Sequence, residues 1–357
     1  MALKKVDPAV IKEAHDLLDW ALTHGNKTVA ELSTISTMRR STVGTIDRGV
    51  GYSQGEPIGT QLAPEVNSSE DGDERASYLK WGKEAFFDGA DDTIPIRGNV
   101  KTADVDGSWQ TLTLDVHANQ VIAEPREIRI AAANGMDLAS VKFELARQKT
   151  ELKKEVHIAG VMTTSGNYTT NTTLTSGGTG TRWDNYAPNG TSWYSLPLFD
   201  IANNKETIRG LTGRIPRALF VGPKVFKALR FHPQILSLVS GGATKANPGA
   251  PIGADLLAAL LDVDLYVGNM VKTTTNSSSA ALTDVWGKFA GLVIIGEADL
   301  YSPQFALTLT SGGYPKTRQF EDMNVGAEGS QIYRFIDAYK TQVVMADGGA
   351  LFTTAVS

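Results

Sequence analysis

The strongest fold signal of the chain is RALFVGP at residues 217–223, followed by VFKALRFHP at 225–233. After a linker rich in Gly, Ala and Pro, residues 256–268 read LLAALLDVDLYVG. The apolar run before Gly222 predicts a buried strand, and Pro223 suits the first position of a helix. The second half predicts a helix that leads into another buried strand. This stretch, Arg217 to Met270, therefore predicts a packed α/β core, and it contains no catalytic signature.

The longest helical pattern lies upstream, over residues 137–163. Six apolar residues recur there at helical spacing: Leu138, Val141, Leu145, Leu152, Val156 and Ala159. Asp137 suits the N-cap position, and Arg147 and Glu151 can form an i,i+4 ion pair. About 26 residues at a rise of 1.5 Å each give a rod of roughly 40 Å, which is long for a globular helix.

Residues 92–117 predict a β-hairpin. Asp106 and Gly107 form a strong two-residue turn signal, and Leu112, Leu114 and Val116 then alternate with polar residues. An isolated two-stranded hairpin is only marginally stable in water, so its apolar face needs a covering surface. That surface is either the rest of its own domain or a neighbouring subunit.

The N-terminal region predicts a helix and then an extended arm. Asp7 suits the N-cap, Pro8 suits the first helical position, and Gly25 ends the helical pattern. The apolar face of this helix packs either on a partner subunit or on its own domain. Residues 33–75 are rich in Ser, Thr, Gly and Asp without a sustained period, which is typical of a segment that lies on another surface.

Composition excludes several classes of protein. The chain has 357 residues, enough for two or three subdomains, and no cysteine, which rules out disulfides, thiolate metal sites and cysteine nucleophiles. A net charge of -5 argues against a protein that grips nucleic acid through its phosphates. No apolar run approaches the roughly 18 residues that span a bilayer, and no signal peptide is evident.

Residues with catalytic or metal-binding potential are few. The histidines are His15, His24, His117, His157 and His232, and no two have the spacing of metal ligands. His232 is predicted to cap a helix end, because histidine favours helix C-termini. Asp262 and Asp264 would share one face of an extended segment, as a cation or acid/base pair or, more commonly, as a solvated strand entrance.

Motifs for phosphate loops, dinucleotide binding, nucleophile elbows and zinc helices are also missing from the sequence. We therefore predict that the chain is not an enzyme. We also predict no catalytic residues, no cofactor and no metal site.

The order of these parts resembles the HK97-type fold of tailed-phage major capsid proteins. The order runs arm, hairpin, long helix, α/β domain and late strands. Local stretches are similar to one branch of that family: WGKEAF at 81–86, PRALFVGP at 216–223, VFKAL at 225–229, His232-Pro233, 256–268, and WGK at 286–288. The resemblance extends from about residue 75 to the end of the chain, and the order of the stretches carries it.

The resemblance implies an α+β chain with an HK97-like capsid fold. It assigns residues 1–75 to an N-terminal helix and arm, 76–130 to an extended β-hairpin loop, 131–199 to a peripheral domain with a long spine helix, 200–325 to a mixed α/β axial domain, and 326–357 to C-terminal strands that return to the peripheral and axial core. Axial tips meet at five-fold and six-fold axes in this family. The linker from Gly241 to Gly253 is therefore a candidate contact loop near such an axis.

The implied function is that of a major capsid protein. Such a chain self-assembles as pentamers and hexamers into an icosahedral shell that encloses double-stranded DNA, in a virion assembled in the host cytoplasm. The implied partners are other copies of the chain, a portal, a decoration protein and, because the sequence starts at Met1, a separate scaffolding protein; no membrane is involved. Some members cross-link a lysine of the extended loop; Lys101 is the only lysine near the predicted tip, and we expect no cross-link.

Two alternatives stay open. An encapsulin-like bacterial compartment has the same fold and encloses a cargo enzyme instead of DNA. An α/β enzyme would also use the strand and helix units of residues 217–268, and it predicts a deep pocket near Asp262 and Asp264.

Overall fold

The computed structural model describes residues 55–69, 73–81, 83, 87, 93, 98, 107–135, 137–175, 181–186, 195–239, 252–274, 281–326 and 328–357. The chain divides into two compact units. Within the described residues, the smaller unit comprises residues 122–143 and 321–331, and the larger unit comprises the rest. The predicted N-terminal helix, most of the arm, the hairpin tip with Lys101, and most of the Gly241–Gly253 linker lie outside the described residues.

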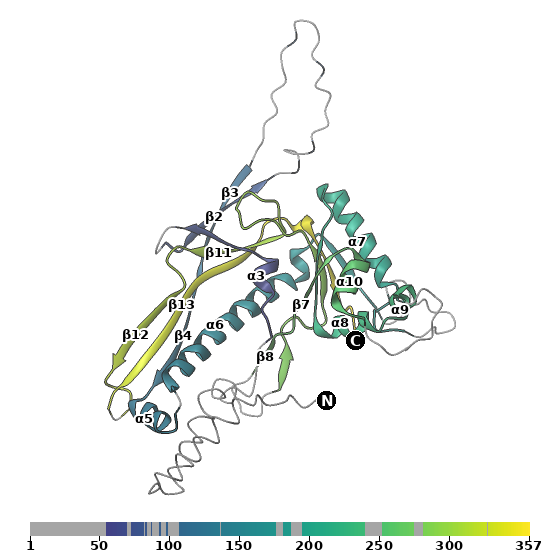
Figure 1. The fold of residues 1–357 in the computed structure, drawn as a ribbon. Helices are drawn as coiled ribbons and strands as arrows, with labels where there is room; N and C mark the ends of the chain where they lie inside the picture. The colour runs from purple at the N-terminus through teal and green to yellow at the C-terminus, as the bar shows by residue number, and fades with distance from the viewer. Residues whose placement is uncertain are drawn as a thin grey trace, which may run out of the picture. The chain divides into compact units, whose positions relative to one another are not determined.

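The larger unit contains a five-stranded mixed sheet, whose edge strand β7 (Asp264–Val267) is labelled in Figure 1. Its strand order is β5 (Thr170–Thr173), β14 (Gly349–Thr353), β10 (Ala290–Val293), β6 (Ala218–Val221) and β7 (Asp264–Val267). β6 pairs with β7 in parallel and with β10 antiparallel, so Leu219 lies between Leu265 and Leu292. The stretch from Arg217 to Met270 thus supplies two neighbouring strands, and the predicted α/β core is confirmed.

Three helices connect β6 to β7: α8 (Pro223–Arg230), α9 (Pro233–Val239) and α10 (Ala254–Leu261). Pro223 occupies the first turn of α8, as predicted. Gly222 stands before it because a Cβ at this position would lie 2.0 Å from the carbonyl oxygen of Gly287. The sequence prediction is wrong on one point: β7 is half-buried, not buried, because it is the edge strand of the sheet.

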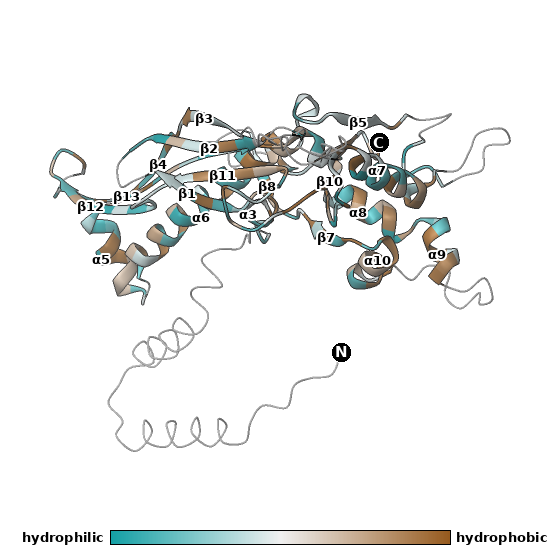
Figure 2. Ribbon diagram, turned by 90° about the horizontal axis from the view of Figure 1, so that it is seen from above, coloured by the Kyte–Doolittle hydropathy of each residue, from teal (hydrophilic) through white to brown (hydrophobic). Residues whose placement is uncertain are grey.

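The two faces of the sheet are covered by different helices. Leu219 and Val221 of β6 join a hydrophobic cluster with side chains from α7 (Pro197–Thr212), α8 and α10. Phe220 faces the other way, into a cluster that includes Ile158 and Met162. The alternation of side chains along a strand therefore places one helical layer on each face. Figure 2 shows the apolar colour along α7, α9 and α10.

The long helix α6 (Leu138–Met162) confirms the longest predicted helix. Its start is capped as predicted, because an Asp137 carboxylate oxygen accepts a hydrogen bond from the Ser140 amide at 3.2 Å. The predicted apolar stripe is only partly right. Its members Leu138 and Leu145 are half-buried, while the buried residues are Ala146, Thr150, Glu155, Ile158, Ala159 and Met162.

A second five-stranded sheet joins distant parts of the chain. Its order is β1 (Glu65–Ser69), β11 (Ala306–Ser311), β13 (Ser330–Val343) and β12 (Lys316–Asp322), and β4 (Asp115–Ala123) also pairs with β13. β1 runs parallel to β11, with Val66 opposite Leu309. The last part of the predicted arm is therefore a strand of this sheet, and the short helix α3 (Gly59–Leu62) precedes it.

A two-stranded antiparallel ribbon pairs β2 (Arg75–Trp81) with β3 (Gly107–Thr113). The predicted turn at Asp106-Gly107 is wrong, because Gly107 is a strand residue paired with Trp81 across a long connection. The predicted apolar face also ends early. Leu114 is 3% exposed and lies between β3 and β4, whereas Val116 is 46% exposed. A separate small ribbon pairs β8 (Val271–Thr273) with β9 (Leu282–Asp284).

The smaller unit contains α5 (Pro125–Ala133), none of whose residues is buried. Lys142 forms an ion pair with Glu127 and donates a hydrogen bond to the Ile122 carbonyl at 2.9 Å. Arg129 contacts both carboxylate oxygens of Glu328 at 2.8 Å. In the described part of the chain, none of the helices combines the length and apolar character needed to cross a bilayer.

Candidate interaction surfaces and polar centres

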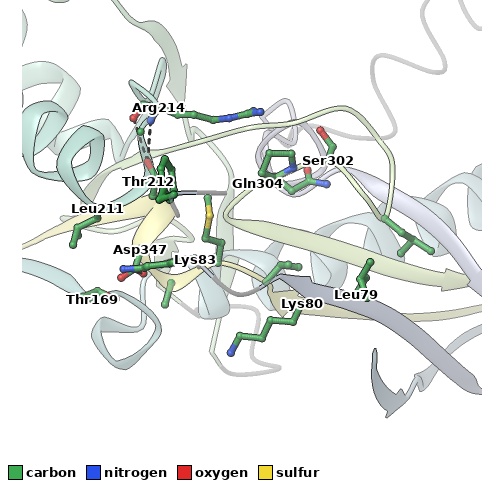
Figure 3. Close-up of a pocket in the computed structure, with 17 residues that line it drawn as sticks. Leu79, Lys80, Lys83, Thr169, Leu211, Thr212, Arg214, Ser302, Gln304 and Asp347 are labelled. Carbon is green, nitrogen blue, oxygen red and sulfur yellow. Dashed lines mark hydrogen bonds and ion pairs between the residues drawn. The ribbon is translucent and has the colours of Figure 1, made fainter. Parts of the chain in front are cut away.

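A cavity of about 540 Å³ opens at the base of the β2–β3 ribbon (Figure 3). The end of α7 and the segments before β11 and after β13 complete its wall. Apolar side chains dominate the lining, with Leu79, Leu211, Leu300, Val344 and Met345 among them. Phe87, which lies between β2 and β3 in sequence, also lines the cavity and packs against Gly213, the residue that ends α7.

The charges at this cavity are mostly positive. Lys80, Lys83 and Arg214 line it, with Asp347 as the single carboxylate among the described lining residues. The Lys83 ammonium lies 2.6 Å from Asp347. Burial raises the pKa of Asp347, but hydrogen bonds from Lys83 and Thr169 and the charges of Lys83 and Lys80 outweigh it, so this pKa lies below its ordinary value. The described lining includes no histidine, and its one carboxylate is ion-paired, so the cavity offers no acid/base pair.

The aspartates predicted as a possible pair do not share a face. Asp262 ends α10 with a left-handed φ of 50°, so the segment is not extended there, and its side chain is 96% exposed. Asp264 begins β7 and is exposed as well. Lys205 of α7 holds this helix end by donating to the carbonyl oxygens of Leu261 at 2.7 Å and Asp262 at 2.5 Å. The commoner reading, a solvated strand entrance, is the one that the structure shows.

Helices α7, α9 and α10 each expose a large apolar side chain, and we call Phe199, Leu238 and Leu256 together the apolar face. Phe199 is 59% exposed, Leu238 55% and Leu256 48%. A small hollow of about 220 Å³ is lined by Leu198, Ile201, Ala202, Lys205, Leu238, Leu260 and Leu261. Lys205 and Leu261 bring this hollow next to Asp262, but it is small and neither Asp262 nor Asp264 lines it, so it is not the deep pocket that the enzyme alternative predicts. An apolar face of this kind is typical of a protein interaction surface.

Glu155 is a polar centre that the sequence did not reveal. This α6 carboxylate is 1% exposed. It accepts hydrogen bonds from the amides of Ile58 at 3.1 Å and Gly59 at 2.8 Å, and from the Trp286 indole at 2.7 Å. It thereby connects α6, the start of α3 and the loop before β10. In sequence, Glu155 follows two lysines and is indistinguishable from a residue on an exposed helix face.

The structure places the predicted histidines in different surroundings. His15 and His24 lie outside the described residues. His117 and His157, which have no metal-ligand spacing in sequence, come together with their ring centroids 6.0 Å apart. Among the described residues, no group of three or more His, Cys, Asp or Glu is placed to hold a metal ion.

His232 does cap a helix, but at the opposite end from the one predicted. Its Nδ1 accepts a hydrogen bond from the Gln234 amide at 3.2 Å, so it caps the start of α9 and not the end of α8. Its Nε2 therefore carries the proton and donates to the Ser195 hydroxyl at 2.7 Å. Burial lowers the pKa of His232 to about 4. The imidazole is consequently neutral at pH 7.

No protein-family model matches the chain. The major capsid protein of Burkholderia phage BcepMu is 23% identical over 312 residues, which cover 85% of this chain and 93% of that protein.

Two solved structures are similar to this chain in fold. The first is a phage-related protein from Bordetella bronchiseptica RB50, with a TM-score of 0.63, 24% identity, and coverage of 88% of this chain and 96% of that one. The second is a chain from the capsid of cyanophage P-SCSP1u, with a TM-score of 0.54, 12% identity, and coverage of 84% and 89%.

These likenesses confirm the predicted resemblance and the predicted α+β fold class: the chain has the fold of phage capsid proteins. The relative that matches over most of both chains is a phage major capsid protein. The boundaries of the five predicted segments stay predictions.

Proposed function

We propose that this chain, with its phage capsid fold, is the major capsid protein of a tailed phage and assembles as pentamers and hexamers into an icosahedral shell. The observation that carries the proposal is the extent of the match to a phage major capsid protein, which covers 85% of this chain and 93% of the relative. A likeness over nearly the whole of both chains supports a shared role better than a shared motif does. The chain is not an enzyme in this proposal.

The apolar face on α7, α9 and α10 is the surface we assign to contacts between copies. Monomeric proteins rarely expose contiguous apolar patches larger than a few hundred Å². Phe199, Leu238 and Leu256 each leave about half or more of their surface exposed in the single chain. A second copy that covers these side chains would remove them from water and stabilise the assembly.

The direct test is assembly of the purified or co-expressed chain. We expect sedimentation and electron microscopy to show capsomers or closed shells, either from the chain alone or after addition of a scaffolding protein. A chain that stays monomeric under every such condition, including co-expression with the neighbouring structural genes, contradicts the proposal.

A variant pair tests the assigned face. Phe199→Glu removes an exposed apolar side chain and adds a charge, and we expect it to reduce assembled particles at least tenfold while the monomer stays folded. Asn203→Glu adds the same charge one turn further along α7, without removing apolar surface. Equal yields of particles from the two variants would exclude Phe199 from the interface.

The contents of the shell separate a capsid from an encapsulin-like compartment. A net charge of -5 suits a wall that confines DNA without gripping its phosphates. We expect particles from infected cells to protect double-stranded DNA from nuclease, and genes for a portal, terminase and tail to lie beside this one. A neighbouring cargo-enzyme gene and particles without DNA would favour the compartment.

A further inference from the structure

Three ring side chains, one buried and two half-buried, meet where α6 packs on the second sheet. His157 comes from α6, His117 from β4 and Tyr339 from β13. The His117 ring stacks on Tyr339 at 4.4 Å between centroids, and His157 meets Tyr339 edge-on at 5.8 Å. We call these three residues the ring cluster. The ring cluster lies apart from the apolar face on α7, α9 and α10 that we assign to contacts between copies.

The polar atoms of the ring cluster are unusual in having no partners. Within the described part of the chain, Nε2 of His117, Nε2 of His157 and the hydroxyl of Tyr339 are buried and make no hydrogen bond. Most buried polar atoms in proteins do have a partner, and one that lacks a partner costs about 1–3 kcal/mol. The rings of the cluster thus pack by their faces and edges, without hydrogen bonds from these polar atoms among the described residues.

Charged groups from every neighbouring element face the ring cluster. On α6, Lys154 lies 4.9 Å above the Tyr339 ring and pairs with Glu65 of β1 at 2.7 Å and Asp337 of β13 at 3.3 Å. On the other side, Lys340 of β13 pairs with Asp115 of β4 at 3.3 Å. Each carboxylate near the cluster already has a lysine partner, so a new positive charge on a histidine would find none unused among them.

We propose that His157, which packs against His117 and Tyr339, is a pH-sensitive switch that controls the packing of helix α6. When His157 takes up a proton, α6 separates from β4 and β13. The inference concerns the folded single chain, so it stands or falls independently of what the chain assembles into.

The electrostatics agree in sign with this switch. Burial lowers the pKa of His157, the charges of His117 and Lys340 lower it further, and Asp115 partly opposes them. A histidine whose pKa is lower in the packed state stabilises that state fully above its ordinary pKa of 6.5. That contribution is lost as the pH falls through the lowered pKa, because the separated state then binds the extra proton more tightly.

The absence of cysteine from the chain makes a thiol reporter practical. Thr150 is 4% exposed and stands on the same side of α6 as Lys154 and His157, so Thr150→Cys reports separation of that side. Gly160 is exposed with open space at its Cβ position, so Gly160→Cys reports the intrinsic reactivity of a thiol on the same helix. A reagent that reacts in mild acid labels both variants.

We expect the labelling rate of Thr150→Cys, relative to Gly160→Cys, to rise several-fold from about pH 7.5 to about pH 4.5. Adding His157→Phe, which fills the site with a ring that cannot titrate, should abolish most of that rise. His157→Gln serves the same purpose if the phenylalanine variant does not fold. His232→Gln should leave the rise intact, because His232 lies between α8 and α9.

Two results would overturn the proposal. One is a rise that persists unchanged when His157 is replaced. The other is a wild-type ratio that stays constant over this pH range while circular dichroism shows an intact fold.

Discussion

Helix α6 carries two polar centres within one turn, and they are built in opposite ways. Glu155 is buried with hydrogen bonds from Ile58, Gly59 and Trp286. His157, two residues later, is half-buried, and its Nε2, like that of His117 and the hydroxyl of Tyr339, has no partner within the described residues. Both positions look like parts of a charged helix face in the sequence.

The difference teaches how one helix can be fixed on one side and adjustable on another. Three hydrogen-bond donors compensate the Glu155 carboxylate for its loss of hydration, so we expect this centre to hold α6 in place. In the ring cluster, the three polar atoms make no hydrogen bonds among the described residues. His157 can gain a proton, which adds a positive charge where the nearby carboxylates are already paired with lysines. Variants at the two centres should therefore differ widely in cost.

Replacement of Glu155 has the largest expected effect. Glu155→Leu keeps the side-chain volume but leaves three buried donors without an acceptor, at about 1–3 kcal/mol each. We expect the free energy of unfolding to fall by on the order of 3–6 kcal/mol in urea titrations followed by circular dichroism. Glu151→Leu removes a carboxylate from the solvent-exposed i,i+4 pair with Arg147 on the same helix and should cost about 1 kcal/mol or less. Similar losses for both would mean that Glu155 has no special role.

The pH dependence of the unfolding free energy tests a third buried centre, His232. Its pKa of about 4 lies below the ordinary 6.5, so its contribution is complete above pH 6.5 and disappears as the pH falls to about 4. The difference corresponds to about 3 kcal/mol of unfolding free energy. In His232→Gln, the decline of stability between about pH 6.5 and pH 4 should be shallower than in the wild type by about that amount. Parallel pH profiles for the two proteins would contradict this assignment.

A substitution at Trp286 distinguishes the contribution of its aromatic ring from that of its hydrogen bond to Glu155. Trp286→Phe keeps an aromatic ring but removes the indole donor and part of the packing against Gly268, where a Cβ would lie 2.1 Å from the indole. We expect a loss of about 1–3 kcal/mol, smaller than for Glu155→Leu because two donors to the carboxylate remain. Trp109→Phe, on exposed β3, is the matched control and should leave the unfolding midpoint unchanged.

Local patterns in the sequence predicted the elements that a few consecutive residues determine. The α8 start at Pro223, the α6 cap at Asp137 and the strand β6 each depend on a few consecutive residues.

Pairing between distant segments could not be predicted in this way. The turn signal at Asp106-Gly107 pointed to a tight hairpin, but β3 pairs with β2, which lies upstream of that turn signal and well separated from it in sequence. The C-terminal strands were predicted only as a group, and their sequence did not show that β13 runs unbroken from Ser330 to Val343. Glu155 and the ring cluster acquire their character only from residues brought in by the fold, so no local pattern marks them.

Tyr339→Phe has the smallest expected effect, although Tyr339 is among the largest fully buried side chains. Its hydroxyl has no partner within the described residues, so its removal sacrifices no hydrogen bond and relieves the cost of burying it. We expect unfolding free energy to stay within about 0.5 kcal/mol of the wild type or to rise, as measured in urea at neutral pH. Tyr168→Phe is the control of opposite sign, because the Tyr168 hydroxyl donates to the Met162 carbonyl at 2.5 Å, and its loss should cost about 1 kcal/mol. A larger loss for Tyr339→Phe than for Tyr168→Phe would show that the hydroxyl of Tyr339 has a hydrogen-bond partner, and the ring cluster would then be a satisfied centre like that of Glu155.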